Sequence, residues 1–404
     1  MAPSASALPS GRSPGIVEVV EDAELQCEGV GVLFERLTTV LDPSLSSTVE
    51  PGQKAVTDDE GTSDWTAGQT GGYIWDSLIR AGVSFRHYGQ YDDETNYIQG
   101  IPVYLPIVRN PQPSSGAIQG VPRYQALFNN TDLYFRGWDL NVPDEYRFEQ
   151  WNREFNAYVA NGNLPSFKFM TLMLDHTGDF GSNVGNLDTP TLEVSSNDHA
   201  IGQVVAAVSH SPYWSNTAIF IEEDDAQAGQ DHVDAHRQVG FVISPWTKHG
   251  AVIDRYYNSE SVLRTIEDLL GADHLGFYDA NTPSMDDVFT KKPNLATYSA
   301  ITPGDLCQPP VAQGLVPCLG VPKSGTIRPR HNGAWWQDHT RGLSFDGPDR
   351  NDALAYDRLL WRGLVGDRPY PSARSGLNLR ANRSALLGRV RPPVESAADD
   401  VAVR

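Results

Sequence analysis

The chain has 404 residues, enough for one large domain or two medium ones with a substantial core. With 31 basic and 51 acidic side chains its net charge is −20, which argues against a nucleic-acid partner because a phosphate backbone would be repelled. No window approaches 18 apolar residues, so no transmembrane segment is expected. The polar N-terminus has no apolar signal-peptide core, so the sequence as it stands is expected to be cytoplasmic; a missing N-terminal signal segment would make it periplasmic or secreted.

The three cysteines, Cys27, Cys307 and Cys318, form no CxxC pair, which makes a thiolate zinc site a poor interpretation. Cys307 and Cys318 bracket a Pro-rich loop. They are compatible either with a disulfide in an oxidising compartment or with two unpaired thiols.

Apolar periodicity predicts the secondary structure in chain order. Helical spacing and helix-ending glycines predict helices over 73–81, 143–161, 197–208 (capped by Asn197-Asp198), 259–270 and 352–364. Short β-branched runs predict strands over 83–88, 167–174, 217–221 and 239–243, and residues 16–20 are also strand-like.

Helices that alternate with short apolar strands indicate an α/β fold with a largely parallel sheet covered on both faces. Composition and periodicity divide the chain into an N-terminal segment without a clear pattern (1–70), an α/β core (71–300), a Pro/Gly-rich linker (301–345) and a C-terminal helical segment with its tail (346–404).

The strand at 217–221 runs into four consecutive acids that end in Asp224 and Asp225. His232 and His236 follow with a spacing of four, which places both on one face. Crowded carboxylates repel one another unless a cation offsets the charge, and carboxylate with imidazole is the ligand set of a hydrolytic divalent metal site. The alternatives are a solvated acidic loop and a pair of surface histidines.

Asp175 and His176 follow the strand at 167–174. In open parallel sheets, ligands bind beyond the carboxyl ends of the strands, so two strands are expected to deliver acids and histidines to one edge. Taken singly, Asp175-His176 is equally compatible with a helix cap or a loop pair. The sequence contains no GxSxG, GxGxxG, P-loop or HExxH motif, which lowers the case for serine-esterase or nucleotide chemistry.

These motifs together resemble the bacterial phosphoesterase family of the alkaline-phosphatase superfamily, which includes phospholipase C and acid phosphatases. The resemblance is carried by Gly72–Asp76, Ala81–Gly89, Asp175–Thr177, Ser209–Trp214, Glu223–Gln227, Asp231–Arg237, Val242–Pro245, Tyr257–Glu267, Leu359–Trp361 and Pro369–Pro371.

The resemblance implies an α/β/α sandwich that hydrolyses small phosphate esters at a divalent metal (Zn, Mn, Mg or Ca). It implies Asp175, Asp224 and Asp225 as metal ligands. It also implies that His176, His232 and His236 act as catalytic side chains that bind the metal or the phosphoryl oxygens.

The N-terminal part of the chain departs from the family pattern. The resemblance implies a first core strand that ends in an acid and Asn, followed by a Thr or Ser nucleophile, and neither can be placed in residues 1–70. Thr38 and Thr39 lie in a segment with helical spacing. Compared with the resembled family, residues 1–70 are therefore expected to be an atypical or truncated N-terminal segment. Two functions are therefore predicted: a metal-dependent phosphoesterase, or a catalytically incomplete relative that binds a divalent cation without turnover.

Overall fold

A computed structural model of the chain describes residues 15–21, 73–98, 101–122, 124–223, 239–318, 329–345 and 351–370. The α-helices are α2 (Ile74–Ala81), α3 (Asp144–Asn161), α4 (Pro190–Ser209), α5 (Ser259–Leu270), α6 (Phe277–Asn281), α7 (Gly333–His339) and α8 (Ala353–Leu364). The strands are β1 (Gly15–Glu21), β2 (Phe85–Tyr88), β3 (Asp92–Asp93), β4 (Thr95–Ile98), β5 (Ile101–Tyr104), β6 (Val121–Pro122), β7 (Phe167–Leu172), β8 (Thr217–Glu223) and β9 (Gly240–Ile243). Short 3₁₀ turns are Pro113–Ser115, Gln125–Leu127, Trp214–Asn216 and Asp286–Val288.

Five strands form the central sheet in the order β2-β7-β1-β8-β9. The first four run parallel, and β9 pairs antiparallel with β8 at the edge. The predicted largely parallel sheet is therefore confirmed. Two small antiparallel pairs, β3 with β6 and β4 with β5, lie outside it.

The strand-like segment near the N-terminus occupies the middle of this sheet. Ile16 pairs in register with Phe167 on one side and with Ala218 on the other. Its β-branched residues favour extended backbone. The sheet therefore has its first core strand, although the sequence pattern alone left that strand in doubt.

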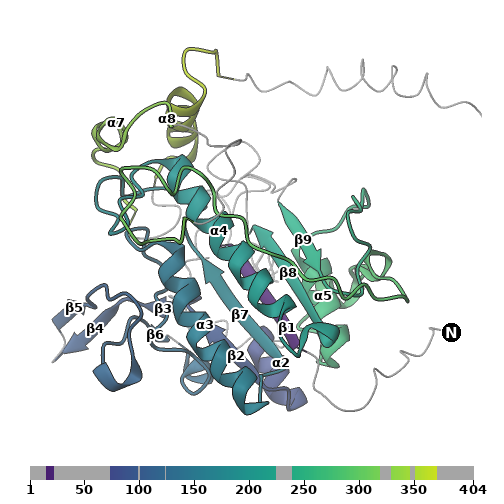
Figure 1. Cartoon of the computed structure of the whole chain (residues 1–404). Coiled ribbons are helices and arrows are strands. Elements are labelled where there is room, and N and C mark those ends of the chain that lie inside the picture. Colours follow the sequence, from purple (N-terminus) through teal and green to yellow (C-terminus); the bar gives the residue numbers. More distant parts are fainter. Residues whose placement is uncertain are drawn as a thin grey trace, which may run out of the picture.

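Helices cover both faces of the sheet, as Figure 1 shows. On one face, Trp151 of α3 and Val204 of α4 pack with Met170 of β7 and Ile219 of β8. On the other face, α2 and α5 contribute a second buried cluster with β2, β7 and β8. The predicted three-layer α/β/α arrangement is confirmed, and apolar burial on both faces explains the nearly continuous hydrophobic strands.

Helix α4 begins seven residues before the predicted start at Asn197. Thr189 is its N-cap and accepts a hydrogen bond from the amide of Leu192, and Pro190 takes the first helical position. The predicted cap was wrong because the Asn197 side chain donates to Asp144 of α3 at 3.2 Å instead of to its own helix start.

The described part of the Pro/Gly-rich segment lies against the body of the fold. Leu306 and Leu315 are buried in one cluster with Leu174 and Leu187, and Cys307 and Cys318 form a disulfide. The composition suggested an irregular linker for this segment, but residues 301–318 pack against the fold. Helices α7 and α8 follow and pack Trp336 and Tyr356 against Phe180. No described helix is long and apolar enough to cross a membrane.

Candidate active site

The carboxyl ends of β7, β1 and β8 lie side by side at one edge of the sheet. Glu21, the last residue of β1, is in register with Leu172 of β7 and Glu223 of β8. The chain crosses from β1 to β2 and β7 on one side and later to β8 and β9 on the other, so β1 marks the topological switch point where α/β sheets bind ligands. With strands ~4.8 Å apart, the ends of β7 and β8 are about 10 Å apart.

Asp175 and His176 form a half-buried turn directly beyond β7 at this edge. The amide of His176 donates to the carbonyl of Met173 at 3.2 Å. The imidazole lies edge-on to the Trp138 ring, with centroids 4.6 Å apart, and the Trp138 indole donates to the carbonyl of Phe345. Aromatic packing therefore restricts the orientation of the His176 ring.

Asp144, the first residue of α3, holds the end of β7 in place. Its buried carboxylate accepts hydrogen bonds from the amides of Met173 at 3.2 Å and Leu174 at 3.0 Å. The same carboxylate pairs with the guanidinium of Arg147 at 2.8 Å, and neither side chain is exposed. Arg147 also donates to four backbone carbonyls in residues 136–142. Charge-assisted bonds to a fixed helix terminus thus position the backbone that leads to Asp175.

The turn continues through a tightly packed Thr177-Gly178 pair. Thr177 has a left-handed backbone (φ 46°), which is uncommon outside glycine and is held by the Tyr356 hydroxyl, 2.7 Å from the Thr177 carbonyl. A Cβ on Gly178 would lie 2.4 Å from the Phe345 ring, so the position requires glycine for space. Helix α8 is thereby tied to the candidate site.

The environment of the turn is strongly acidic. Glu193 of α4 is fully buried and accepts a hydrogen bond from the amide of Gly178 at 2.9 Å. Burial raises the pKa of Glu193 well above its usual range, and the nearby charges of Asp179, Asp188 and Asp144 raise it further. Across the edge, burial and the charge of Glu260 raise the pKa of Glu222 to about 8. Such an excess of carboxylates fits a site that holds a cation.

Comparisons with known proteins identify the family of the chain. The sequence matches the model of the Phosphoesterase family over residues 38–272, more than half of the chain. The chain belongs to the Phosphoesterase family. It is also similar to non-specific phospholipase C6 of Arabidopsis thaliana, with 23% identity over 220 residues, which covers 42% of this chain and 42% of the plant protein. The chain thus spans less than half the length of that relative.

A solved protein of the alkaline phosphatase superfamily from Vibrio parahaemolyticus is a weaker structural match. It has 15% identity and a TM-score of 0.36, and the match covers 68% of this chain and 71% of the Vibrio protein. The span matched by the Phosphoesterase family, 38–272, includes β2, β7, β8 and β9 with α2, α3 and α4.

The structure describes some of the predicted site residues and leaves others undescribed. Asp175 and His176 lie at the carboxyl edge. The remaining predicted residues lie outside the described part of the chain: Asp224, Asp225, His232 and His236, together with Thr38 and Thr39. The described residues on either side of 224–238 are hydrogen-bonded to each other: the amide of Glu223 donates to the carbonyl of Val239 at 3.0 Å.

Four residues that support the site were not singled out from the sequence: Trp138, Asp144, Glu193 and Tyr356. In the sequence, Asp144 is recognisable only as an acid in the first turn of a helix, which is a common feature. Glu193 lies inside α4, whose start was predicted too late, so its helical context was missed. Nothing local in the sequence links any of the four to the turn at Asp175.

Proposed function

We propose that this chain is a metal-dependent phosphoesterase that hydrolyses phosphate mono- or diesters at the carboxyl edge of its sheet. The observation that carries the proposal is the position of the Asp175-His176 turn at the switch point of a chain that belongs to the Phosphoesterase family. The acidic surroundings of the turn support a cation there, since several carboxyl groups crowded in a partly buried site repel one another when they ionise.

We assign Asp175, Asp224 and Asp225 as metal ligands. A bound divalent cation polarises a phosphoryl oxygen and offsets the charge that develops on it. We assign His176, His232 and His236 to the phosphoryl oxygens or to completing the metal shell. His176 suits this role because its ring is oriented by Trp138 and half-exposed at the edge. Asp144 holds the turn in position but does not touch the substrate in this proposal.

The substrate class is small phosphate esters, which includes phospholipid head groups. The Cys307–Cys318 disulfide favours a periplasmic or extracellular location, because these compartments are oxidising and the cytoplasm is reducing.

Alanine substitution of the ligands tests the assignment. We expect Asp175→Ala and Asp224→Ala each to lower turnover of a chromogenic phosphate ester by more than ~100-fold, since even residues that only support a metal ligand cost 10–100-fold. Asp198→Asn is the control, because this acid is exposed on α4.

Two other outcomes would change the assigned function. Full turnover in both ligand variants would contradict the assignment. Stabilisation of the parent chain by a divalent cation, without turnover on any ester, would favour the catalytically incomplete relative, because a ligand that binds the folded state raises stability even when no reaction follows.

A further inference from the structure

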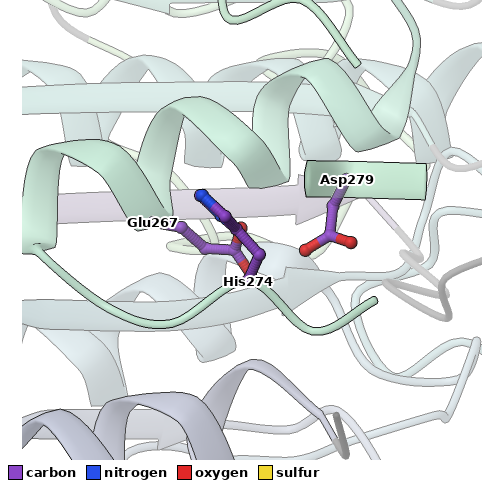
Figure 2. Close-up of side chains that lie close together, drawn as sticks. All are labelled: Glu267, His274 and Asp279. Atoms are coloured by element: carbon purple, nitrogen blue, oxygen red, sulfur yellow. The ribbon is translucent and has the colours of Figure 1, made fainter. Parts of the chain in front are cut away.

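A second group of metal-ligand side chains lies away from the proposed active site. Glu267 is in the last turn of α5, His274 is in the following loop and Asp279 is in α6. Each offers one ligand atom, and these three atoms lie within 4.8 Å of one another. Figure 2 shows the three side chains approaching one another from these segments.

Two of the three groups are carboxyls removed from water. Glu267 is 0% exposed and Asp279 is 1% exposed. One Glu267 oxygen (Oε2) lies 2.8 Å from His274 Nδ1, and the other (Oε1) has no hydrogen-bond partner in the described part of the chain. An unsatisfied buried carboxyl oxygen beside a second carboxylate is costly unless a positive charge lies between them.

Asp279 keeps coordination capacity although it caps α6. Its oxygens accept hydrogen bonds from the amides of Leu275 at 2.6 Å and Gly276 at 2.7 Å, and each carboxylate oxygen has a further lone pair. The guanidinium of Arg264, whose charge acts on Glu267, pairs with Asp268 at 2.8 Å and donates to backbone carbonyls of α6. This basic side chain therefore has other partners.

The group lies at the amino edge of the sheet, opposite the proposed active site. Helix α5 begins beside Glu222, to which Ser259 is hydrogen-bonded, and it rises ~12 Å along its axis from Ser259 to Glu267. Beyond α5, the carbonyl of Asp273 accepts a hydrogen bond from Ser77 of α2 at 2.5 Å. A ligand here would join α5 and α6 next to α2.

We propose that Glu267, His274 and Asp279 form a binding site for a divalent transition-metal ion of the Zn²⁺ type, which stabilises the fold and takes no part in hydrolysis. Two carboxylates and one imidazole are zinc ligands, and water would complete a tetrahedron. Metal–ligand bonds of ~2.0–2.2 Å require the three ligand atoms to adjust their separations around the ion. His274 is 31% exposed and has room to make that movement.

The experiment uses the full chain after removal of metal with EDTA. Bound Zn²⁺ is counted by elemental analysis, and affinity is measured by calorimetric titration with Zn²⁺ alone. We expect Glu267→Gln and His274→Gln each to lose one equivalent of Zn²⁺ or to weaken its binding by at least ~100-fold. We also expect each variant to lose the Zn²⁺-dependent rise in melting temperature that this site supplies. The control is Asp198→Asn, an exposed acid on α4, which is expected to bind as the parent does.

The active-site variant Asp175→Ala separates the two proposals, because it is expected to lose hydrolysis and keep the Zn²⁺ that depends on Glu267. The inference is overturned if both Gln variants bind as much Zn²⁺ as the parent with the same affinity and thermal shift. It is also overturned if Asp175→Ala binds no Zn²⁺. If Glu267→Gln does not fold, His274→Gln at the partly exposed position decides the matter.

Discussion

At the level of single residues, the sequence reveals the candidate site residues better than the residues that hold them in position. Asp175 and His176 stand out in the sequence because they follow a strongly apolar strand. The structure adds Asp144, which lies 31 residues earlier and fixes the amides of Met173 and Leu174. Such a partner cannot be read from local pattern, because the contact exists only once α3 packs beside the end of β7.

Asp144→Asn tests this support. The substitution keeps the size of the side chain but leaves the buried guanidinium of Arg147 without its counter-charge. We expect a loss of ~3 kcal/mol in unfolding free energy, measured by urea denaturation, since breaking a buried ion pair typically costs 3–5 kcal/mol. We also expect hydrolysis to fall further than folding alone explains at a temperature where the variant is folded.

Asp198→Asn on α4 is the matched control and should change neither quantity, because its side chain is exposed. An Asp144→Asn variant with the stability and turnover of the parent would show that the end of β7 does not depend on this carboxylate.

At the scale of elements, most helices and strands were predictable from periodicity and stop signals. Gly162 and Gly271 end α3 and α5 in the left-handed conformation, as expected for helix-ending glycines. The predicted start of α4 was wrong because the Asn197 side chain makes a tertiary hydrogen bond to Asp144 and does not cap its own helix. The antiparallel direction of β9 was also not predicted, since an apolar run carries no information on strand direction.

Helix α8 is tied to the Asp175-His176 turn of the candidate site by one hydroxyl, which gives a second prediction. Tyr356→Phe removes the hydrogen bonds of that hydroxyl with the Thr177 carbonyl and the Thr177 hydroxyl. We expect a loss of ~1–3 kcal/mol, because the buried carbonyl of Thr177 is left without this donor. Thermal unfolding measures the loss, and Tyr256→Phe at a 77% exposed position is the control. Equal destabilisation by both substitutions would contradict a specific tie.

Strand β7 carries a buried lysine whose titration gives a third prediction. Burial lowers the pKa of Lys168 from its ordinary 10.5 to about 7, and its ammonium group meets only the carbonyl of Pro165 among the described hydrogen bonds. Between these two pKa values the unfolded chain binds more protons than the folded chain. The contribution of Lys168 to stability therefore rises with pH from about 7 to 10.5, by ~1.4 kcal/mol per pH unit.

Lys168→Met should stabilise the chain at pH 7, because a similar volume is kept and the cost of burying the amine is removed. We expect the difference in unfolding free energy between variant and parent to shrink as the pH rises toward 10. A difference that stays constant across that range would show that Lys168 does not titrate as its burial implies.

At the scale of the whole molecule, the fold class followed from the alternation of helices and strands, and the topology did not. The N-terminal strand β1 lies between β7 and β8, far from its place in the sequence. Residues 301–318 pack on the same body. We propose a core that includes β1 and this segment in addition to residues 71–300, with 346–404 as a C-terminal helical segment and tail. Long-range pairing of this kind depends on tertiary contacts that one sequence does not display.

We propose above that the carboxyl edge of this sheet hydrolyses phosphate esters with the help of a divalent metal. The most direct measurement is hydrolysis of a chromogenic phosphomonoester and a phosphodiester by the EDTA-treated chain, with each of Zn²⁺, Mn²⁺, Mg²⁺ and Ca²⁺ restored in turn. We predict that EDTA abolishes turnover and that at least one metal restores it. We also predict that Asp175→Ala prevents this restoration and that Glu267→Gln does not. Turnover that persists without metal, or that no metal restores, would contradict the proposal.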